Sequence, residues 1–351
     1  MNNSKGSLPI SWQRITLIAL CVILTLILAV MIYLTGYVHR ILNAVSGDGH
    51  SINATLSPED LATATEYYDP SIPPTGPSTE PFTQSTVPAP PIVNTDTDHI
   101  SNSLLIGEDR RPGQVRQRSD SMILCSFNTK NNTLTMVSFL RDIYISQIPG
   151  YASRGPQKLN AAYQFGGAYT LDETLASYFG VRVDSNVAVQ FDGFVGIIDM
   201  LGGVDIELTE KEAKYLNELG GWKLTAGMQH LDGKKALAYT RIRKIDMDAM
   251  RAQRQRKLLT ALINRYRDHS LPEMLSLASD IVQTGFVKTS MTSSELTGYI
   301  VSLFPILSSA NIRNQQIPAE NTYTLKYIAG LGECKIPDLE KNRKILQQIL
   351  N

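Results

Sequence analysis

The stretch VAVQFDGFVGIIDMLGGVDIEL, Val187–Leu208, indicates the fold class of this chain. Four of its apolar residues are spaced i, i+3, i+4 and i+7, which predicts a helix that ends at Gly202 and Gly203. These residues are Phe194, Ile197, Ile198 and Leu201. On either side, Val187–Phe191 and Val204–Leu208 are β-branched or alternating runs and are predicted to be strands. The succession of strand, helix and strand favours an α/β fold.

Three more strands are predicted upstream of this stretch. They are Ser103–Ile106, Ser121–Phe127 and Thr133–Ser138. Thr129–Asn132 (TKNN) is rich in turn-forming residues and is expected to join the last two strands as a hairpin. Residues 98–351 are therefore predicted to form a folded α/β domain.

Helical patterns alternate with these strands. Thr170 and Glu173 have the spacing of a capping box, which predicts a helix start, and this helix is expected to end at Gly180. Leu296–Phe304 and Asp338–Leu350 are further segments with helical periodicity.

A long uncharged segment near the N-terminus predicts a membrane span. Residues 15–37 carry no charge and would extend about 34 Å as a helix, more than a hydrocarbon core of about 30 Å. Lys5 and Arg14 precede the span without an acidic residue, so residues 1–14 are expected to be a cytoplasmic tail. The alternative is a cleaved signal peptide, but the apolar run exceeds the usual length and lacks a clear cleavage site before Gly36.

Residues 38–97 are predicted to be an extracytoplasmic linker. The segment is rich in Ser, Thr, Pro and Gly, with eight prolines between Pro70 and Pro91 and few large apolar residues. Such a composition cannot build a hydrophobic core, so we expect a partly extended tether between the membrane and the folded domain.

Positive charge is concentrated in residues 241–257. Seven basic residues stand there against two acidic ones, although the whole chain has a formal net charge of +0. This distribution disfavours non-specific nucleic-acid binding and favours a local phosphate site. A solvated basic face is the alternative interpretation.

A helix in this region would place arginines on its inward face. The predicted inward residues are Arg251, Arg254, Gln255, Leu258, Leu259, Leu262 and Tyr266. The predicted outward residues are Gln253, Arg256, Lys257 and Asn264. A charge facing inward is unfavourable unless it is paired, so an anionic group is expected beside this helix. Arg241 and Arg243, two apart on a predicted strand or strand end, would add two more guanidinium groups.

Zinc and serine-nucleophile chemistry find little support. The five histidines are scattered without metal-ligand spacing, and the sequence contains no HExxH, paired CxxC or GxSxG motif. Cys125 and Cys334 leave two alternatives open, because an extracytoplasmic location permits a disulfide and a cysteine in an apolar strand is often a core residue.

Seven consecutive motifs resemble the LytR-CpsA-Psr family, membrane-anchored glycopolymer ligases of the Gram-positive cell wall. In chain order they are LLIGEDRR (104–111), RSDSMIL (118–124), SFLRDIY (138–144), KLNAAYQFGG (158–167), FDGFVGIIDMLGGVDIEL (191–208), LDGKKALAYTRIRK (231–244) and RAQRQRKLL (251–259). Each motif alone is weak, but their order and spacing together are specific.

The resemblance implies an α-β-α sandwich with a central mixed sheet. It also implies transfer of a phosphorylated glycan from a polyprenyl-pyrophosphate carrier to a hydroxyl of peptidoglycan, with release of polyprenyl phosphate. In this family a long apolar cavity for the lipid meets a polar mouth that holds the diphosphate and a divalent metal, usually Mg²⁺, with Mn²⁺ as a substitute. Diphosphate suits the planar fork of arginine, and Mg²⁺ prefers carboxylate, phosphate and water oxygens.

Carried onto this sequence, the resemblance assigns roles to nine residues. The catalytic, phosphate-gripping arginines are Arg118, Arg141, Arg241 and Arg243. Further diphosphate-binding residues are Lys158, Arg251 and Gln255. The metal ligands are Asp109 and Asp120. Whether Arg110 or Arg111 also faces the site stays open. Asp142 and Asp192 are expected to be structural, the latter as a helix N-cap.

Two other functions are compatible with the same residues. One is a polyprenyl-pyrophosphate phosphatase that uses water as the acceptor, and the other is a non-catalytic lipid-binding regulator. For the ligase, the glycopolymer stays open between teichoic acid, capsule and other chains. The expected location is the cell membrane, with one span and an extracytoplasmic catalytic domain.

Overall fold

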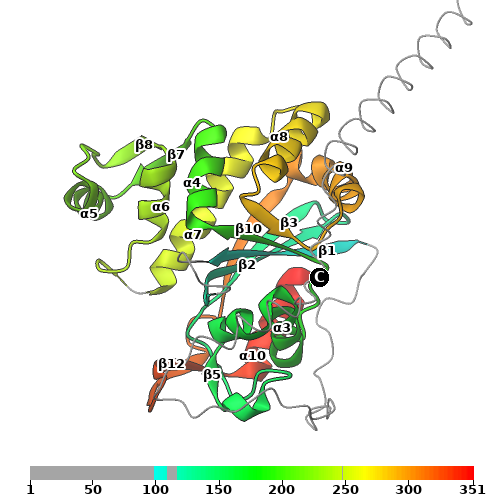
Figure 1. Ribbon diagram of the computed structural model, residues 1–351, viewed down its shortest axis with the longest axis vertical. Coiled ribbons are helices and arrows are strands. Elements are labelled where there is room, and N and C mark those ends of the chain that lie inside the picture. Colours follow the sequence, from blue (N-terminus) through cyan, green and yellow to red (C-terminus); the bar gives the residue numbers. More distant parts are fainter. Residues whose placement is uncertain (1–98, 109–116, 247) are drawn as a thin grey trace, which may run out of the picture. The chain divides into compact units, whose positions relative to one another are not determined.

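A six-stranded mixed sheet forms the centre of the fold (Figure 1). The structure is a computed structural model and describes residues 99–108, 117–246 and 248–351. Its strands are β1 (Ile100–Glu108), β2 (Ser119–Asn128), β3 (Thr133–Phe139), β6 (Ser185–Gln190), β9 (Val287–Thr289) and β10 (Asn311–Ile317). Their order is β10-β3-β2-β1-β6-β9. β1 runs parallel to β6 and β3 parallel to β10, whereas the other neighbours are antiparallel.

The predicted hairpin between β2 and β3 is confirmed. The two strands pair from Ile123 opposite Ser138 to Asn128 opposite Thr133. The Asn128 side-chain oxygen accepts hydrogen bonds from the backbone N–H groups of Lys130 and Asn131, which closes the turn from within.

Helices cover both faces of the sheet. On one face, residues such as Leu104 and Leu124 pack against α3 (Asn160–Phe179) and α10 (Leu339–Leu350). On the other, residues such as Ile123 contact α7 (Asp248–Tyr266) and α9 (Ser293–Ser309), and Figure 1 shows the two helix layers on opposite sides. Because successive side chains of a strand alternate between faces, apolar strands buried on both sides produce this three-layer arrangement. The expected α/β fold with a central mixed sheet is confirmed.

Helix α3 corrects one prediction. α3 consists of two helical runs separated at Gly167, whose φ of 71° and ψ of −155° are not helical. Glycine adopts this backbone conformation without the clash that a Cβ atom would cause. The second run begins directly after Gly167, so the predicted helix start lies close to the observed one, although Thr170 is inside the run and is not its N-cap. The predicted end is confirmed, since Gly180 caps the helix in the left-handed conformation with a φ of 70°.

A second hydrophobic cluster lies beside the sheet and carries part of the site. Its elements are α4 (Phe191–Met200), β7 (Val204–Leu208), α5 (Glu210–Gly220), β8 (Gly227–Leu231) and α6 (Gly233–Thr240). β7 pairs with β8 and not with the central sheet. Ile198, Leu216 and Leu258 are buried together and join this cluster to α7. The N-cap of α4 is Gln190, so the prediction that Asp192 is an N-cap is wrong, and Asp192 lies in the first turn.

The remaining elements complete the described chain. They are β4 (Tyr144–Ile145), the 3₁₀ helix η1 (Ala152–Arg154), β5 (Gln157–Lys158), α8 (Leu271–Gln283), β11 (Tyr323–Ile328) and β12 (Gly332–Pro337). The two predicted C-terminal helices correspond to α9 and α10. Cys125 and Cys334 are free, buried thiols, so the disulfide left open by the sequence does not form.

The predicted tail, membrane span and linker, residues 1–14, 15–37 and 38–97, lie outside the described residues. Within the part that is described, none of the helices combines the length and the apolar character that a membrane crossing requires.

Candidate active site

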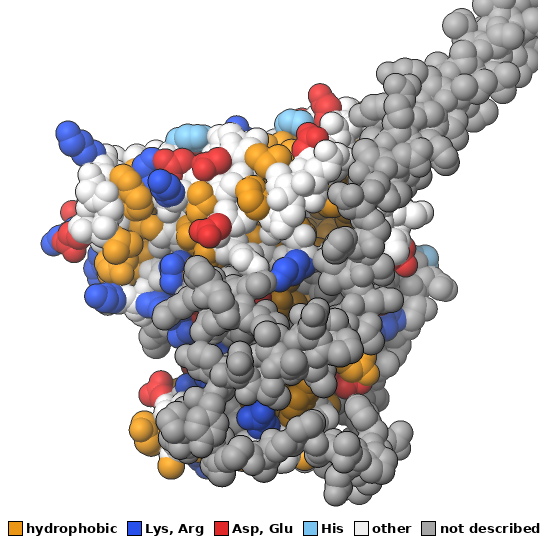
Figure 2. All heavy atoms as spheres, in the orientation of Figure 1, with side chains coloured by type: hydrophobic (Ala, Val, Ile, Leu, Met, Phe, Trp, Pro, Cys, Tyr) orange, Lys and Arg blue, Asp and Glu red, His pale blue; other side chains and the backbone are white. Residues whose placement is uncertain are grey.

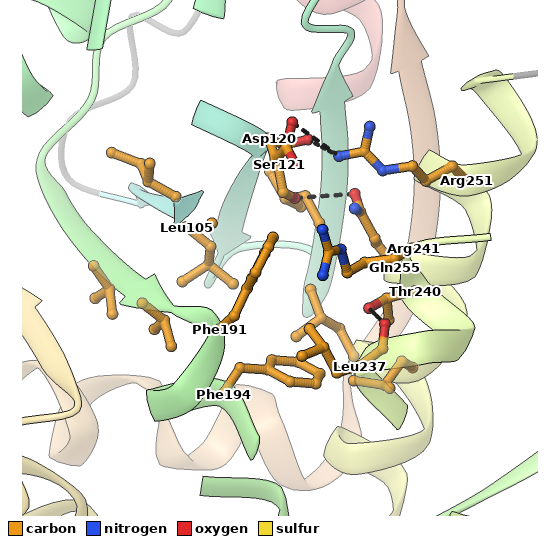
Figure 3. A pocket seen from close by; sticks show the side chains of 17 residues that line it. Leu105, Asp120, Ser121, Phe191, Phe194, Leu237, Thr240, Arg241, Arg251 and Gln255 are labelled. Atoms are coloured by element: carbon orange, nitrogen blue, oxygen red, sulfur yellow. Dashed lines mark hydrogen bonds and ion pairs between the residues drawn. The ribbon is translucent and has the colours of Figure 1, made fainter. Parts of the chain in front are cut away.

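A cavity of about 160 Å³ lies between the central sheet and helices α4, α6 and α7 (Figure 3). Its apolar lining includes Leu105, Ile123, Val187, Val189, Phe191, Phe194, Leu237, Leu258 and Leu259. Its polar lining is Asp120, Ser121, Thr240, Arg241, Arg251 and Gln255. In Figure 3, Asp120 and Arg251 lie at the end opposite Phe194 and Leu237, so the cavity has one polar and one apolar end.

A smaller cavity adjoins the polar end. It shares Asp120, Ser121, Arg251 and Gln255 with the larger one and adds Arg141 and Asp248 to the lining. We call the polar mouth the set Asp120, Ser121, Arg141, Arg241, Arg243, Asp248, Arg251 and Gln255. Figure 2 shows Lys and Arg side chains on the surface around the start of α7, beside this region.

Asp120, at the start of β2, is surrounded by three guanidinium groups. Arg141 Nη1 lies 3.2 Å from Asp120 Oδ1, and Arg243 Nη2 lies 3.1 Å from Oδ2. Arg251 donates to the backbone carbonyl oxygen of Asp120 and lies 3.8 Å from Oδ1. These arginines come from the segment after β3, from the α6–α7 loop and from α7, so the tertiary fold alone assembles them.

Asp248, in the first turn of α7, is a second carboxylate within the same cluster. Arg251 Nη1 donates to Asp248 Oδ1 at 3.1 Å, and Arg141 Nε lies 3.5 Å from Oδ2. Burial acts to raise the pKa of Asp248, but the charges of Arg251 and Arg141 outweigh it and hold the pKa below its ordinary value. Burial lowers the pKa of Arg251, an effect that Asp120 and Asp248 only partly offset.

Arg241 and Gln255 stand at the boundary between the polar and apolar parts. Arg241 caps the end of α6, and its guanidinium carbon lies 4.2 Å from the centroid of the Phe191 ring. The hydroxyl of Ser121 donates to Gln255 Oε1 at 3.0 Å, which orients the amide. The prediction that Arg241 and Arg243 lie on a strand is wrong, because they occupy the end of a helix and the loop that follows it.

The structure gathers most of the predicted site residues but not all. Arg118 is exposed and donates to Gln164 of α3 at 3.3 Å rather than pairing with Asp120. Lys158 lies on β5 and lines neither cavity. Asp109, Arg110 and Arg111 lie outside the described residues. Asp142 has a structural partner, as predicted, because Lys335 donates to its carboxylate.

Two arginines of α7 differ from the predicted helix faces. Arg254 belongs to neither cavity and pairs instead with Glu212 and Asp246. Arg256, predicted to face outward, is 8% exposed. The helix therefore buries residues on more sides than its apolar stripe indicates, because the α5 and α6 segments and the sheet both pack against it.

Three residues of the site were not predicted from the sequence. Asp248 had a detectable signal, because its i, i+3 spacing to Arg251 is that of a helical ion pair. Ser121 is next to a predicted metal ligand but has no distinguishing spacing. Phe191 had no signal as an arginine partner, since its contact with Arg241 joins residues fifty positions apart.

The chemistry of Asp120 is compatible with a metal ligand. Its carboxylate accepts from Arg141 at Oδ1 and from Arg243 at both oxygens, and a carboxylate has about four lone-pair sites in all. One position therefore remains for a cation. Mg²⁺ commonly takes one or two carboxylates and completes its shell with phosphate oxygens and water. Among the described residues no group of three or more His, Cys, Asp or Glu side chains forms a protein-only metal site.

The family model of the LytR_cpsA_psr family matches residues 77–346 of this sequence. The chain belongs to the LytR-CpsA-Psr family. The cavity with its arginine-rich mouth is thus a feature of a LytR-CpsA-Psr protein, as the motifs indicated.

Curated relatives of this LytR-CpsA-Psr protein are named as teichoic acid transferases. It is 31% identical over 252 residues to the polyisoprenyl-teichoic acid–peptidoglycan teichoic acid transferase TagV of Bacillus subtilis, a match that covers 70% of this chain and 63% of TagV. It is 34% identical over 257 residues to the transferase TagU of Bacillus mycoides, covering 70% of this chain and 78% of TagU.

Solved structures of the same family share the fold. The crystal structure of B. subtilis TagV has a TM-score of 0.59 and 30% identity, covering 72% of this chain and 97% of that one. The structure of YwtF (TagT) of B. subtilis with bound octaprenyl pyrophosphate lipid has a TM-score of 0.54 and 26% identity, covering 72% and 91%.

Proposed function

We propose that this protein transfers a phosphorylated glycopolymer from a polyprenyl-pyrophosphate carrier to a hydroxyl of peptidoglycan. The observation that carries the proposal is the convergence of Arg141, Arg241, Arg243 and Arg251 at the polar end of an apolar cavity. The bound lipid of TagT and the transferase names of TagV and TagU support the same substrate class.

The two ends of the cavity match the two parts of such a donor. Apolar side chains from β1, β2, β6, α4 and α7 offer a dry surface for a prenyl chain. Guanidinium groups at the mouth offer paired donors for diphosphate oxygens. Asp120 and Asp248 hold three of these arginines in position before the donor arrives, because each carboxylate forms ion pairs with two or more of them.

In the reaction, the acceptor hydroxyl attacks the glycan-side phosphorus while the bond to the bridging oxygen breaks. A phosphodiester to peptidoglycan forms, polyprenyl phosphate leaves, and the hydroxyl proton passes to solvent. The arginines stabilise the charge that develops on the leaving phosphate. Asp248 is poorly suited as a general base, because its pKa lies below the ordinary value and arginines already occupy its oxygens.

Asp120 and Asp109 are the residues that would hold Mg²⁺ or Mn²⁺ in this scheme. A divalent ion bound there would supply further neutralisation of phosphate charge. Asp120 has the lone-pair capacity for this role, and Asp109 follows β1 directly in the sequence. We further propose that residues 15–37 anchor the protein in the cell membrane with its catalytic domain on the extracytoplasmic side.

Hydrolysis of the same donor is the second candidate, because water is small enough to replace the acceptor hydroxyl at the same phosphorus.

The experiment compares full-length wild type with Arg241→Ala, using a lipid-linked glycan donor and peptidoglycan. We expect transfer to peptidoglycan by the wild type and a loss of about 10²-fold or more in the variant, as for other removed charge-stabilising donors.

Lys214→Ala is the matched control, because Lys214 is an exposed residue of α5 outside the polar mouth. It should retain wild-type transfer. Full activity of Arg241→Ala would contradict the assignment. Release of free glycan phosphate without any labelled peptidoglycan would favour the hydrolase.

A further inference from the structure

Arg254 is a buried arginine whose guanidinium group bonds to Glu212, Asp246 and Ile242. It is 4% exposed and lines neither cavity. Its Nε donates to Glu212 Oε1 at 2.6 Å, and its Nη1 donates to Asp246 Oδ1 at 3.1 Å. Nη2 donates to the other oxygen of Asp246, and Nη1 lies 3.4 Å from the backbone carbonyl oxygen of Ile242. An arginine guanidinium carries five N–H donors on three nitrogen atoms. In Arg254 each of these three nitrogens donates at least one hydrogen bond.

On one side, the hydrogen bonds of Arg254 lead to Glu212, which is itself fixed by the capping box of α5. Glu212 lies in the first turn of α5, where its Oε2 accepts from the backbone N–H of Thr209 at 2.9 Å. The hydroxyl of Thr209 in turn accepts from the Glu212 N–H, which completes a capping box. Glu212 is therefore fixed at both of its carboxylate oxygens, and Arg254 is held against α5.

On the other side, the hydrogen bonds of Arg254 lead to the loop that carries site residues. Residues 242–246 connect α6 to the start of α7 and form neither helix nor strand. Asp246 and the carbonyl of Ile242 lie at the two ends of this segment, and Arg243 lies between them. Arg243 Nη2 reaches Asp120 at 3.1 Å. A contact at each end of the loop limits how far Arg243 can move away from the mouth.

The charges of the network are mutually consistent. Burial alone would lower the pKa of Arg254, but its hydrogen bonds to Asp246 and Glu212 outweigh burial and raise the pKa. Burial alone would raise the pKa of Glu212, and its bonds to Thr209 and Arg254 lower it. Both groups therefore stay ionised. Paired buried charges of this kind are better known for fixing one arrangement of a chain than for adding stability.

We propose that Arg254 is a positioning residue that holds the 242–246 loop against α5, so that Arg243 reaches the polar mouth. Arg254 lines neither cavity and acts through Arg243. The expected effect of Arg254 on the transfer rate rests on the proposed transferase function. Its expected effect on the motion of the 242–246 loop is independent of that function.

The first experiment measures hydrogen exchange of backbone amides in the full-length protein in detergent. It compares wild type with Arg254→Lys, which keeps the charge but cannot bond Glu212, Asp246 and Ile242 at once. We expect amides 242–246 to exchange about tenfold faster, with amides of β1, β2 and β3 unchanged. Equal exchange throughout would overturn the proposal, and so would a uniform rise over the whole domain, which indicates a general loss of stability.

The second experiment tests whether Arg254 acts through Arg243. Transfer kcat/KM is measured for Arg254→Lys, Arg243→Ala and the double variant. We expect Arg254→Lys alone to lose about tenfold or more, since small misplacements of a charge-stabilising group are costly. In the Arg243→Ala background the same change should lose less than about threefold, because residues that act as a unit are not additive. Independent, multiplying losses would overturn the proposal.

Two further variants test whether the faster exchange is specific to the contacts of the 242–246 loop. Arg265→Lys changes an arginine of the same helix that donates to the carbonyl of Gly203, and it should leave amides 242–246 as in wild type. Asp246→Asn removes charge from the loop side alone and leaves Glu212 paired, so it tests the loop even if Arg254→Lys fails to fold. It should reproduce the faster exchange of amides 242–246. Wild-type exchange in Asp246→Asn would count against the proposal.

Discussion

Arg241 lies over the ring of Phe191, with 4.2 Å between the guanidinium carbon and the ring centroid. Phe191 is the first residue of α4 and lines the apolar cavity, while Arg241 caps α6. The contact therefore sits where the apolar surface meets the polar mouth. A cation over an aromatic face is stabilised by the ring quadrupole, and the ring also restricts the directions in which the guanidinium points.

Phe191→Leu should lower transfer activity while keeping an apolar cavity wall. Loss of a cation–π contact of roughly 0.5–2 kcal/mol corresponds to a drop in kcat/KM of about 2- to 30-fold. Phe194→Leu is the control, because Phe194 lines the same cavity and no arginine of the described residues stacks on its ring. Equal kcat/KM for Phe191→Leu and wild type would show that the ring has no role in placing Arg241.

Removal of divalent metal should abolish transfer, and Asp120→Asn should raise the Mg²⁺ concentration needed to restore it. The neutral amide is a weaker metal ligand than a carboxylate and also loses the charge that holds Arg141 and Arg243. The measurement is transfer after EDTA treatment, titrated with Mg²⁺. Asp205→Asn, at an exposed pair with His230, should titrate as wild type does. Activity unaffected by EDTA would rule out the metal.

Arg256→Met should leave the protein as stable as wild type or raise its free energy of unfolding by about 1–2 kcal/mol. Arg256 is 8% exposed, its Nε and Nη1 have no hydrogen-bond partner among the described residues, and burial lowers its pKa to about 10. Arg254→Met is the contrasting variant. It removes the cationic partner of the buried Glu212 and should lower the free energy of unfolding by about 3–5 kcal/mol. Urea denaturation measures both, and equal losses would refute the contrast.

The buried carboxyl group of Asp172 should lower the free energy of unfolding as the pH rises from about 4 to 7. Burial raises the pKa of Asp172 to about 7, partly opposed by a hydrogen bond from Asn186. Between the unfolded value of 3.8 and about 7, the unfolded chain has lost this proton while the folded one keeps it, so rising pH favours unfolding. At 1.36 kcal/mol per unit the whole effect is up to about 4 kcal/mol. In Asp172→Asn this component should vanish, as measured by urea denaturation at several pH values.

Local patterns predicted elements well where one apolar stripe or one turn decided them. The β2–β3 hairpin and the helix ending at Gly202 follow from the residues themselves. The capping-box spacing of Thr170 and Glu173 placed a helix start close to the second run of α3, which begins after Gly167. The first run, from Asn160, was not predicted, because its residues are buried by packing on the sheet and carry no capping pattern.

The site shows the same division. The motifs pointed to Asp120, Arg141 and Arg251, and these three do meet. The helical wheel of α7 grouped Arg254 with Arg251, but Glu212 and Asp246 draw Arg254 to a separate network. A wheel gives the angle of each side chain, whereas the neighbouring element on that side decides which partner it finds.

The sequence alone determined the α/β class and the family and suggested an anionic group as the ligand, because hydrophobic period, turn chemistry and a local concentration of arginine are properties of local sequence. Only the tertiary structure decided which arginines share a carboxylate, which one is a structural clamp and where the apolar cavity meets them. Those relations join residues tens to more than a hundred positions apart, and distances of about 3 Å between such residues depend on how the helices and sheet pack.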